Sequence, residues 1–129
     1  DIYLNHYYGT PIAPLMELIQ AGKDVLFDLT VSGSLMLKEK YPDAVTIFLL
    51  PPSMTDLRKR LICRGTEKGK VLERRLLEAS VEIPKADLFD YAVINDDLEL
   101  ASARIIAIIE AEKHRYHRQI GIEDRIMNG

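Results

Sequence analysis

The stretch VTIFLLPPSMTD, residues 45 to 56, contains both kinds of element from which the fold is built. Residues 45 to 50 are apolar except for the β-branched Thr46, and such a run predicts a short buried strand. Two prolines then end the strand. Ser53 and Asp56 lie three positions apart, a spacing close to that of a capping box, with Asp in place of Glu. The stretch therefore predicts a strand that leads through a short turn into a helix.

The same alternation continues on both sides of this stretch. Further strands are expected at residues 25–27, which run into Asp28, and at residues 91–94. Capping residues, glycines and prolines predict helices at residues 10–22, 53–65, 70–83 and 97–115. The last helix has an apolar face formed by Leu98, Ala101, Ile105, Ile108 and Ile109. Strands that alternate with helices predict an α/β domain with a mainly parallel sheet.

Length and composition set limits on the class of protein. The chain has 129 residues, of which 47% are hydrophobic, and this is enough for one domain. No apolar run reaches the roughly 18 residues needed to cross a bilayer, so no membrane partner is expected. Cys63 is the single cysteine and has no His or Cys nearby, which argues against both an internal disulfide and a metal site. We expect a cytoplasmic protein, and the sequence leaves open whether it forms a homo-oligomer.

Positive charge is concentrated in one segment. Residues 58 to 75 contain eight of the 17 basic residues and only two acids, whereas the whole chain has a net charge of -3. A local cationic segment on an acidic protein favours a compact anionic ligand such as a nucleotide over a long nucleic acid. A solvated helix face explains the charge from composition alone equally well.

A Gly-Lys pair at residues 22 and 23 is the one trace of a phosphate-binding loop. The G-x-x-x-x-G-K-[ST] pattern requires a glycine where the chain has Glu17 and a hydroxyl residue where it has Asp24. Gly22 is better explained as the residue that ends the preceding helix. The sequence therefore contains no loop of this kind for the β- and γ-phosphates of ATP.

Polar residues follow two of the expected strands. Ligands of open α/β sheets bind at the carboxyl ends of strands, so Asp28 and Asn95 are candidate site residues. The alternative for Asp28 is a turn or helix-capping aspartate. For the run Asn95-Asp96-Asp97 the favoured interpretation is a cap for the last helix.

Two further groups of residues suit a phosphorylated ligand. Tyr8, Gly9 and Thr10 offer neutral hydroxyl donors beside a glycine that permits close approach of the backbone, although tyrosines near a turn often only pack. Arg60 and Arg64 lie four apart on one helix face, and Arg75 follows the glycine-flanked residues 65 to 69. Guanidinium groups stabilise a transferring phosphoryl group. The alternative is a surface pair between Asp56 and Arg60.

Taken together, five segments resemble the guanylate kinase family. They are HYYGTP at 6 to 11, AGKDVLFDLTVSG at 21 to 33, FLLPPS at 48 to 53, RLICRGTE at 60 to 67 and YAVINDDL at 91 to 98. The resemblance implies the α/β fold of P-loop nucleoside monophosphate kinases, a parallel sheet flanked by helices, truncated at the N-terminus. It also implies one domain over 1–129, with the rest of the GMP-binding region at 1–20, the core at 21–64 and 78–129, and a closing lid at 65–77.

The resemblance implies phosphoryl transfer from MgATP to GMP, which gives ADP and GDP. Tyr8, Gly9 and Thr10 would bind the GMP phosphate. Asp28 would lie beside the acceptor and would contact Mg²⁺ only through a bound water, so no residue is expected to bind the metal directly.

The donor side of the implied site consists of arginines and one amide. Arg60, Arg64 and Arg75 would be the catalytic residues at the ATP phosphates, and Asn95 would contact the adenine side. GMP and ATP are the expected partners, with Mg²⁺ as the cofactor of ATP.

The chain departs from the family pattern in three respects. The family's N-terminal third, which contains the phosphate loop, is not in this sequence. Thr30 replaces a second aspartate and Ser32 replaces a glutamine. We therefore expect the chain as written to be inactive alone.

Two alternative functions remain. A guanylate-kinase-like module that binds a phosphorylated peptide would retain Tyr8 and Thr10, but it has less need for Asn95 together with the arginines at 60, 64 and 75. RNA binding through the basic segment lacks the aromatic platform that usually accompanies it.

Overall fold

The computed structural model describes the chain except for residues 1, 4–5, 8–11 and 65–68. It separates into two compact units, Asp1–Ala44 and Val45–Gly129. The first unit contains strands β1 (Ile2–Tyr3) and β2 (His6–Tyr7) and helices α1 (Ile12–Gln20) and α2 (Val31–Lys40). Strands β1 and β2 pair antiparallel, with Ile2 opposite Tyr7.

Helix α1 ends at a glycine, as the sequence predicts. Gly22 has a positive φ of 76°. Its N–H donates to the carbonyl of Ile19 and that of Lys23 donates to the carbonyl of Leu18, both at 3.0 Å. These two hydrogen bonds form a Schellman motif, so Gly22 and Lys23 terminate a helix.

The prediction of a strand at residues 25–27 was wrong. These residues belong to no strand and continue without regular structure to Thr30. A strand needs the backbone of a neighbouring strand for its hydrogen bonds, and none of the described residues provides a pairing there. Leu26 is accordingly 76% exposed.

Helix α2 was not anticipated from the sequence. Its apolar residues Leu35, Met36 and Leu37 are consecutive and form no stripe of helical period. The side chain of Thr30 caps the helix, because its Oγ1 accepts a hydrogen bond from the N–H of Gly33 at 3.0 Å.

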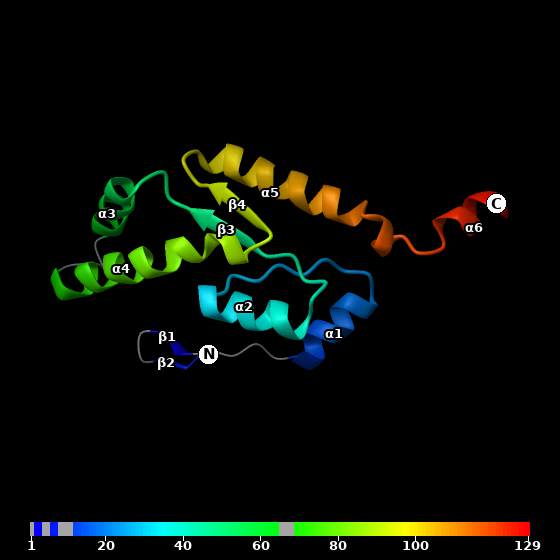
Figure 1. The fold of residues 1–129 in the computed structure, drawn as a ribbon, viewed down its shortest axis with the longest axis horizontal. Coiled ribbons are helices and arrows are strands. Elements are labelled where there is room, and N and C mark those ends of the chain that lie inside the picture. Colours follow the sequence, from blue (N-terminus) through cyan, green and yellow to red (C-terminus); the bar gives the residue numbers. More distant parts are fainter. Residues whose placement is uncertain (1, 4–5, 8–11, 65–68) are drawn as a thin grey trace. The chain divides into compact units, whose positions relative to one another are not determined.

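The second unit has the alternation that the sequence predicts. Its elements are β3 (Ile47–Leu50), α3 (Met54–Cys63), α4 (Gly69–Glu82), the 3₁₀ helix η1 (Ile83–Leu88), β4 (Tyr91–Ile94), α5 (Leu98–Lys113), the 3₁₀ helix η2 (Tyr116–Arg118) and α6 (Ile122–Met127). Strands β3 and β4 pair in parallel, and Figure 1 shows them side by side. Of the expected lid, residues 69–77 form the first part of α4, and 65–68 lie outside the described residues.

The start of the β3–β4 pair is held by one aspartate. The backbone N–H and the hydroxyl of Thr46 donate to Asp90 Oδ2 at 2.8 and 3.1 Å, and the N–H of Asp90 donates to Thr46 Oγ1 at 3.0 Å. Thr46 is buried. These bonds fix the register in which Ile47 lies opposite Tyr91.

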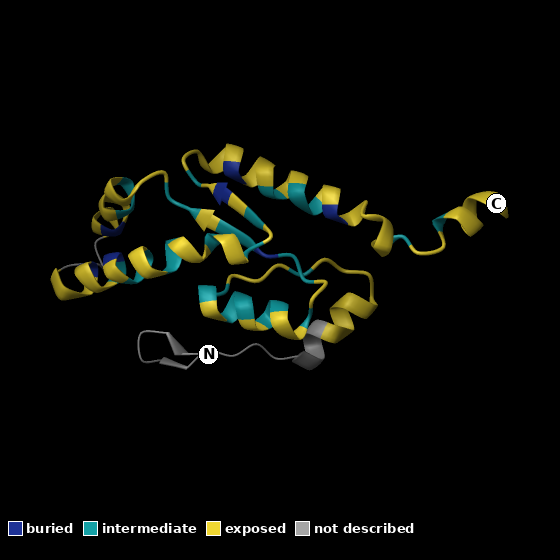
Figure 2. Cartoon of the chain, viewed as in Figure 1, coloured by how far each residue is buried: buried dark blue, intermediate teal, exposed yellow. Residues whose placement is uncertain are grey.

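The buried apolar residues all belong to the second unit among the side chains that the structure describes (Figure 2). Leu61 of α3 packs with Leu72 and Leu76 of α4, and Leu57 adjoins this cluster. Val93 in β4 and Ala101 in α5 are also buried. The expected apolar face of the last helix is confirmed except at Leu98, which is 74% exposed because it starts the first turn of α5.

Helix α5 is tied to β4 and to the residues after it through Glu112. This buried carboxylate accepts a hydrogen bond from the phenol of Tyr91 at 2.5 Å and pairs with Arg115 and Arg118, each at 3.4 Å. The hydrogen bond from Tyr91 lowers the pKa of Glu112, and the same bond raises the pKa of Tyr91.

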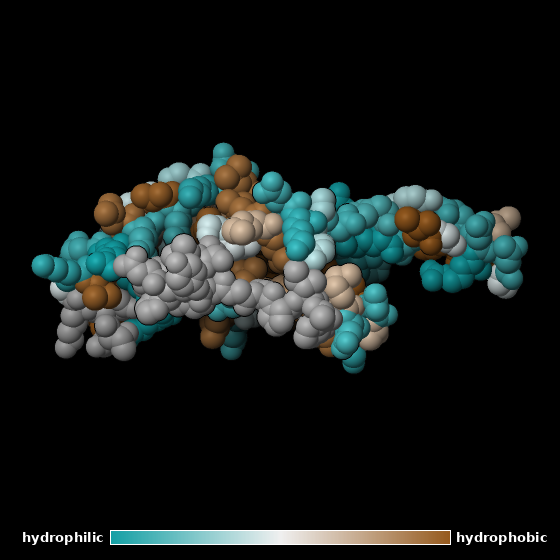
Figure 3. All heavy atoms as spheres, turned by 90° about the horizontal axis from the view of Figure 1, so that it is seen from below, coloured by the Kyte–Doolittle hydropathy of each residue, from teal (hydrophilic) through white to brown (hydrophobic). Residues whose placement is uncertain are grey.

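Apolar side chains reach the surface as well (Figure 3), and Met36, Leu77 and Ile126 are examples with exposed side chains. No helix among the described residues is long and apolar enough to cross a membrane.

Candidate phosphoryl-transfer site

The candidate arginines of α3 face solvent at the end of the helix. Arg64 is the C-cap residue, and its N–H donates to the carbonyl of Arg60 at 3.2 Å. Both residues are exposed. Within the part of the chain that the structure describes, neither guanidinium is paired with a carboxylate. The two positive charges are therefore available to an anion.

The surface pair that the sequence left open for Arg60 does not form. Asp56 instead takes part in the cap of α3, where Ser53 Oγ donates to Asp56 Oδ2 at 2.7 Å and accepts from the N–H of Asp56 at 3.0 Å. The predicted cap is thus confirmed. It engages the carboxylate that could otherwise neutralise Arg60.

Arg75 lies on the neighbouring helix, α4, and is half-buried. It precedes Leu76, which packs into the leucine cluster between α3 and α4. Because Leu57 and Leu61 of α3 adjoin the same cluster, the arginines of both helices are carried by one packed helix pair.

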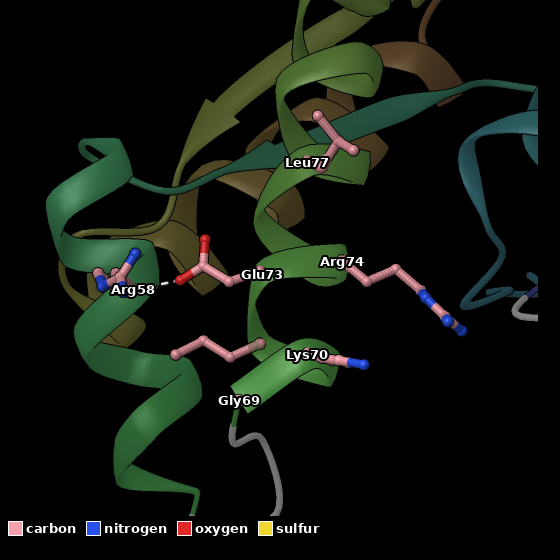
Figure 4. Close-up of a pocket in the computed structure, with 7 residues that line it drawn as sticks. Arg58, Gly69, Lys70, Glu73, Arg74 and Leu77 are labelled. Carbon is pink, nitrogen blue, oxygen red and sulfur yellow. Dashed lines mark hydrogen bonds and ion pairs between the residues drawn. The ribbon is translucent and has the colours of Figure 1, made fainter.

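An ion pair between α3 and α4 was missed by the sequence interpretation. Arg58 Nη2 lies 2.8 Å from Glu73 Oε1. Figure 4 shows these two side chains facing each other, whereas Lys70 and Arg74 project from another side of α4. The pair borders a cavity of about 670 Å³, whose lining residues are Arg58, Gly69, Lys70, Leu72, Glu73, Arg74 and Leu77. The sequence does contain a signal for this ion pair. The pentapeptides LRKRL at 57–61 and LERRL at 72–76 both begin and end with leucine, and their second residues have opposite charges.

Asn95 lies at the carboxyl end of the paired strands. Its N–H donates to the carbonyl of Leu50 at 2.7 Å, which extends the β3–β4 ladder by one residue. The helix cap is Asp97, whose Oδ1 accepts from the N–H groups of Glu99 and Leu100 at 2.9 and 3.2 Å. The predicted cap is therefore confirmed for Asp97. The amide side chain of Asn95 has no hydrogen bond to any described residue, so a ligand could use it.

Asp28 lies in the first unit and is exposed. It is not a helix cap, because Thr30 performs that role for α2. Thr30, which replaces a second aspartate of the family pattern, thus has a structural role as the cap of α2. Tyr8, Gly9 and Thr10, the other candidates on the acceptor side, lie outside the described residues.

The donor set at Asp28 suits Mg²⁺ contacted through water. The described residues contain no group of three or more side chains that could bind a metal. Mg²⁺ retains several waters and is often bound by one or two carboxylates together with substrate phosphates. A single exposed carboxylate such as that of Asp28 fits that mode.

Known proteins resemble this chain over most of its length. The family model described as Guanylate kinase matches residues 2–112. The guanylate kinase of Lactococcus lactis is 46% identical over 118 residues, which are 92% of this chain and 58% of the relative. That of Thermus thermophilus is 47% identical over 116 residues, 90% of this chain and 53% of the relative.

A solved structure resembles this one closely. The crystal structure of guanylate kinase from Anaplasma phagocytophilum superposes with a TM-score of 0.81 at 29% identity, over 96% of this chain and 60% of that chain. The chain thus spans somewhat more than half the length of the relatives that it matches. The α/β fold is that of a guanylate kinase, and the chain belongs to the guanylate kinase family.

Proposed function

We propose that this chain contributes to the transfer of the γ-phosphoryl group of ATP to GMP. An oxygen of the GMP phosphate forms a bond to the γ-phosphorus, and the bond from this phosphorus to the bridging oxygen of ADP breaks. The products are ADP and GDP. The observation that carries the proposal is the pair of exposed arginines on α3, Arg60 and Arg64, with no carboxylate partner among the described residues.

The donor half of the site belongs to the second unit. Arg60, Arg64 and Arg75 bind the phosphates of ATP and offset the negative charge of the transferring group. The resemblance to the family assigns Asn95 to the adenine side. Its backbone is held at the end of β4, and its side-chain amide has no hydrogen bond to a described residue, which is compatible with that role. Positioning and charge neutralisation are thus the contributions of these residues.

The acceptor half comprises Tyr8, Gly9, Thr10 and Asp28. The hydroxyl groups of Tyr8 and Thr10 donate hydrogen bonds to the GMP phosphate, and Gly9 lets the backbone approach it. Asp28 would hold Mg²⁺ through a bound water, and the metal would neutralise charge on the phosphates of ATP.

The test measures ADP formation from ATP with and without GMP. It uses the chain as written and a chimera in which the N-terminal segment of the Lactococcus lactis guanylate kinase precedes it. We expect GMP-dependent turnover in the chimera. Arg60→Gln should lower its kcat/KM by about 100-fold, as the loss of a charged group at a transferring phosphate does. Lys59→Gln, on the same helix but outside the site, should change it less than about twofold.

Absence of turnover in both proteins would overturn the proposal. In that case binding of a phosphopeptide, measured with the same chain, would support the non-catalytic module. Equal effects of the two substitutions would show that Arg60 does not bind the phosphates.

A further inference from the structure

Two matching pentapeptides form the contact between α3 and α4. LRKRL at 57–61 and LERRL at 72–76 place leucines four residues apart, and these leucines make the seam between the helices. In each pentapeptide a charged residue follows the first leucine and an arginine precedes the second. The charged residues are Arg58 and Glu73, and the arginines are Arg60 and Arg75.

Helical geometry puts these two positions on opposite edges of the seam. Each residue advances about 100° around a helix, so the residue after the first leucine and the residue before the second are separated by about 200°. Arg58 and Glu73 occupy equivalent positions and meet at 2.8 Å along one edge. Arg60 and Arg75 are also equivalent to each other, and they therefore flank the other edge.

We propose that the Arg58–Glu73 ion pair is a positioning pair that holds Arg75 in line with Arg60 for binding ATP phosphates. Leucine contacts are non-directional and tolerate rotation of one helix against the other. A hydrogen-bonded ion pair on one edge fixes that rotation, and with it the spacing of the arginines on the opposite edge. This inference rests on the proposed function, because ATP is the anion that the arginines bind.

The pair contributes little to folding. Its side chains are 50% and 63% exposed, and ion pairs of such exposure add little to stability. Its effect is therefore expected in ligand affinity, with the unfolding temperature shifted by less than about 2 °C.

The experiment measures, by isothermal titration calorimetry, the dissociation constant for MgATP of the chimera in which the N-terminal segment of the Lactococcus lactis guanylate kinase precedes this chain. The variants are Arg58→Glu, Glu73→Arg, the charge-swapped double variant and Arg75→Gln, with Lys59→Glu as the control for net charge. We expect Arg58→Glu and Glu73→Arg each to weaken binding about three- to tenfold, and the double variant to restore it to within about twofold of the original.

General electrostatic attraction gives a different pattern. It predicts that Glu73→Arg tightens binding of an anion and that Arg58→Glu weakens it as much as Lys59→Glu does. That pattern, or an unrestored double variant, would overturn the positioning role. So would a loss of affinity that follows a parallel drop in unfolding temperature.

Arg75→Gln separates this inference from the function on which it rests. If Arg75→Gln weakens binding and the swapped variants do not, the positioning role alone is wrong. If the unsubstituted chimera does not bind MgATP, or Arg75→Gln leaves its affinity unchanged, the proposed donor site fails and the inference fails with it.

Discussion

Residues 25–28 and 91–95 are similar in sequence and different in structure. Each is an apolar run that ends in a polar candidate residue, Asp28 or Asn95. The second run pairs with β3, and its Val93 is only 4% exposed. The first run belongs to no strand, and its Leu26 is 76% exposed. The difference shows that an apolar run becomes a strand only where another backbone satisfies its hydrogen bonds.

The comparison extends to the two candidate residues. Asn95 is fixed by the bond from its N–H to the carbonyl of Leu50 at 2.7 Å and by the start of α5 shortly after it. Asp28 lies between irregular residues and the cap of α2 at Thr30. The donor half of the proposed site therefore lies within the second unit. Regular secondary structure fixes the backbone of Asn95 there, whereas Asp28 of the acceptor half lies among irregular residues.

The largest expected effect on stability comes from placing an aspartate in each of the two apolar runs. Val93→Asp buries a carboxylate without a partner and should reduce the free energy of unfolding by more than about 4 kcal/mol. Leu26→Asp, at an exposed position, should change it by less than about 0.5 kcal/mol. Urea denaturation of both variants checks this. Similar losses in the two variants would mean that residues 25–28 are paired in solution.

The next effect concerns the carboxylate that ties α5 to β4. Glu112→Gln should cost roughly 1.5 to 3 kcal/mol at neutral pH, because it removes the negative charge that strengthens the hydrogen bond from Tyr91 and pairs with Arg115 and Arg118. The hydrogen bond holds the pKa of Glu112 below its ordinary value of 4.5. The stabilisation is therefore complete above pH 4.5 and is lost as the pH falls through the lowered value.

Thermal unfolding between about pH 7 and pH 3 measures this dependence. The original chain should lose stability over the acid range, and Glu112→Gln should lose less. Glu110→Gln, an exposed neighbour on the same helix, serves as the control. An acid dependence unchanged by Glu112→Gln would contradict the role assigned to this bond.

The smallest effect on stability separates a helix cap from a site residue. Asp97→Ala should cost about 1 kcal/mol, since its carboxylate caps α5. Asp28→Ala should cost less than about 0.5 kcal/mol, because Thr30 already caps α2. In the chimera, Asp28→Ala should lower GMP-dependent turnover more than Asp97→Ala does. The opposite ranking in turnover would remove Asp28 from the proposed acceptor site.

Much of the fold could be predicted because helix ends are local. Ser53, Gly22 and Asp97 each satisfy backbone groups within a few residues of their own position, and each is readable in the sequence. Helix α2 was not predicted because its apolar residues are adjacent in the sequence and show no helical period. Its cap, Thr30, was interpreted as a departure from the family's site pattern and not as a capping residue. Of the candidate site, the structure describes the exposed positions of Arg60 and Arg64, and the roles of all the candidate residues remain predictions.

By itself the sequence determined where helices α1, α3, α4 and α5 lie, which residues carry the cationic segment, and which family the motifs resemble. Only the tertiary structure decided which apolar runs became strands and which polar side chains contact each other across the fold. Thr46 and Asp90 are 44 residues apart, Tyr91 and Glu112 are 21 apart, and Arg58 and Glu73 are 15 apart. The physical reason is that capping uses hydrogen bonds within one turn, whereas strand pairing and these long-range side-chain contacts need partners that only the folded chain brings together.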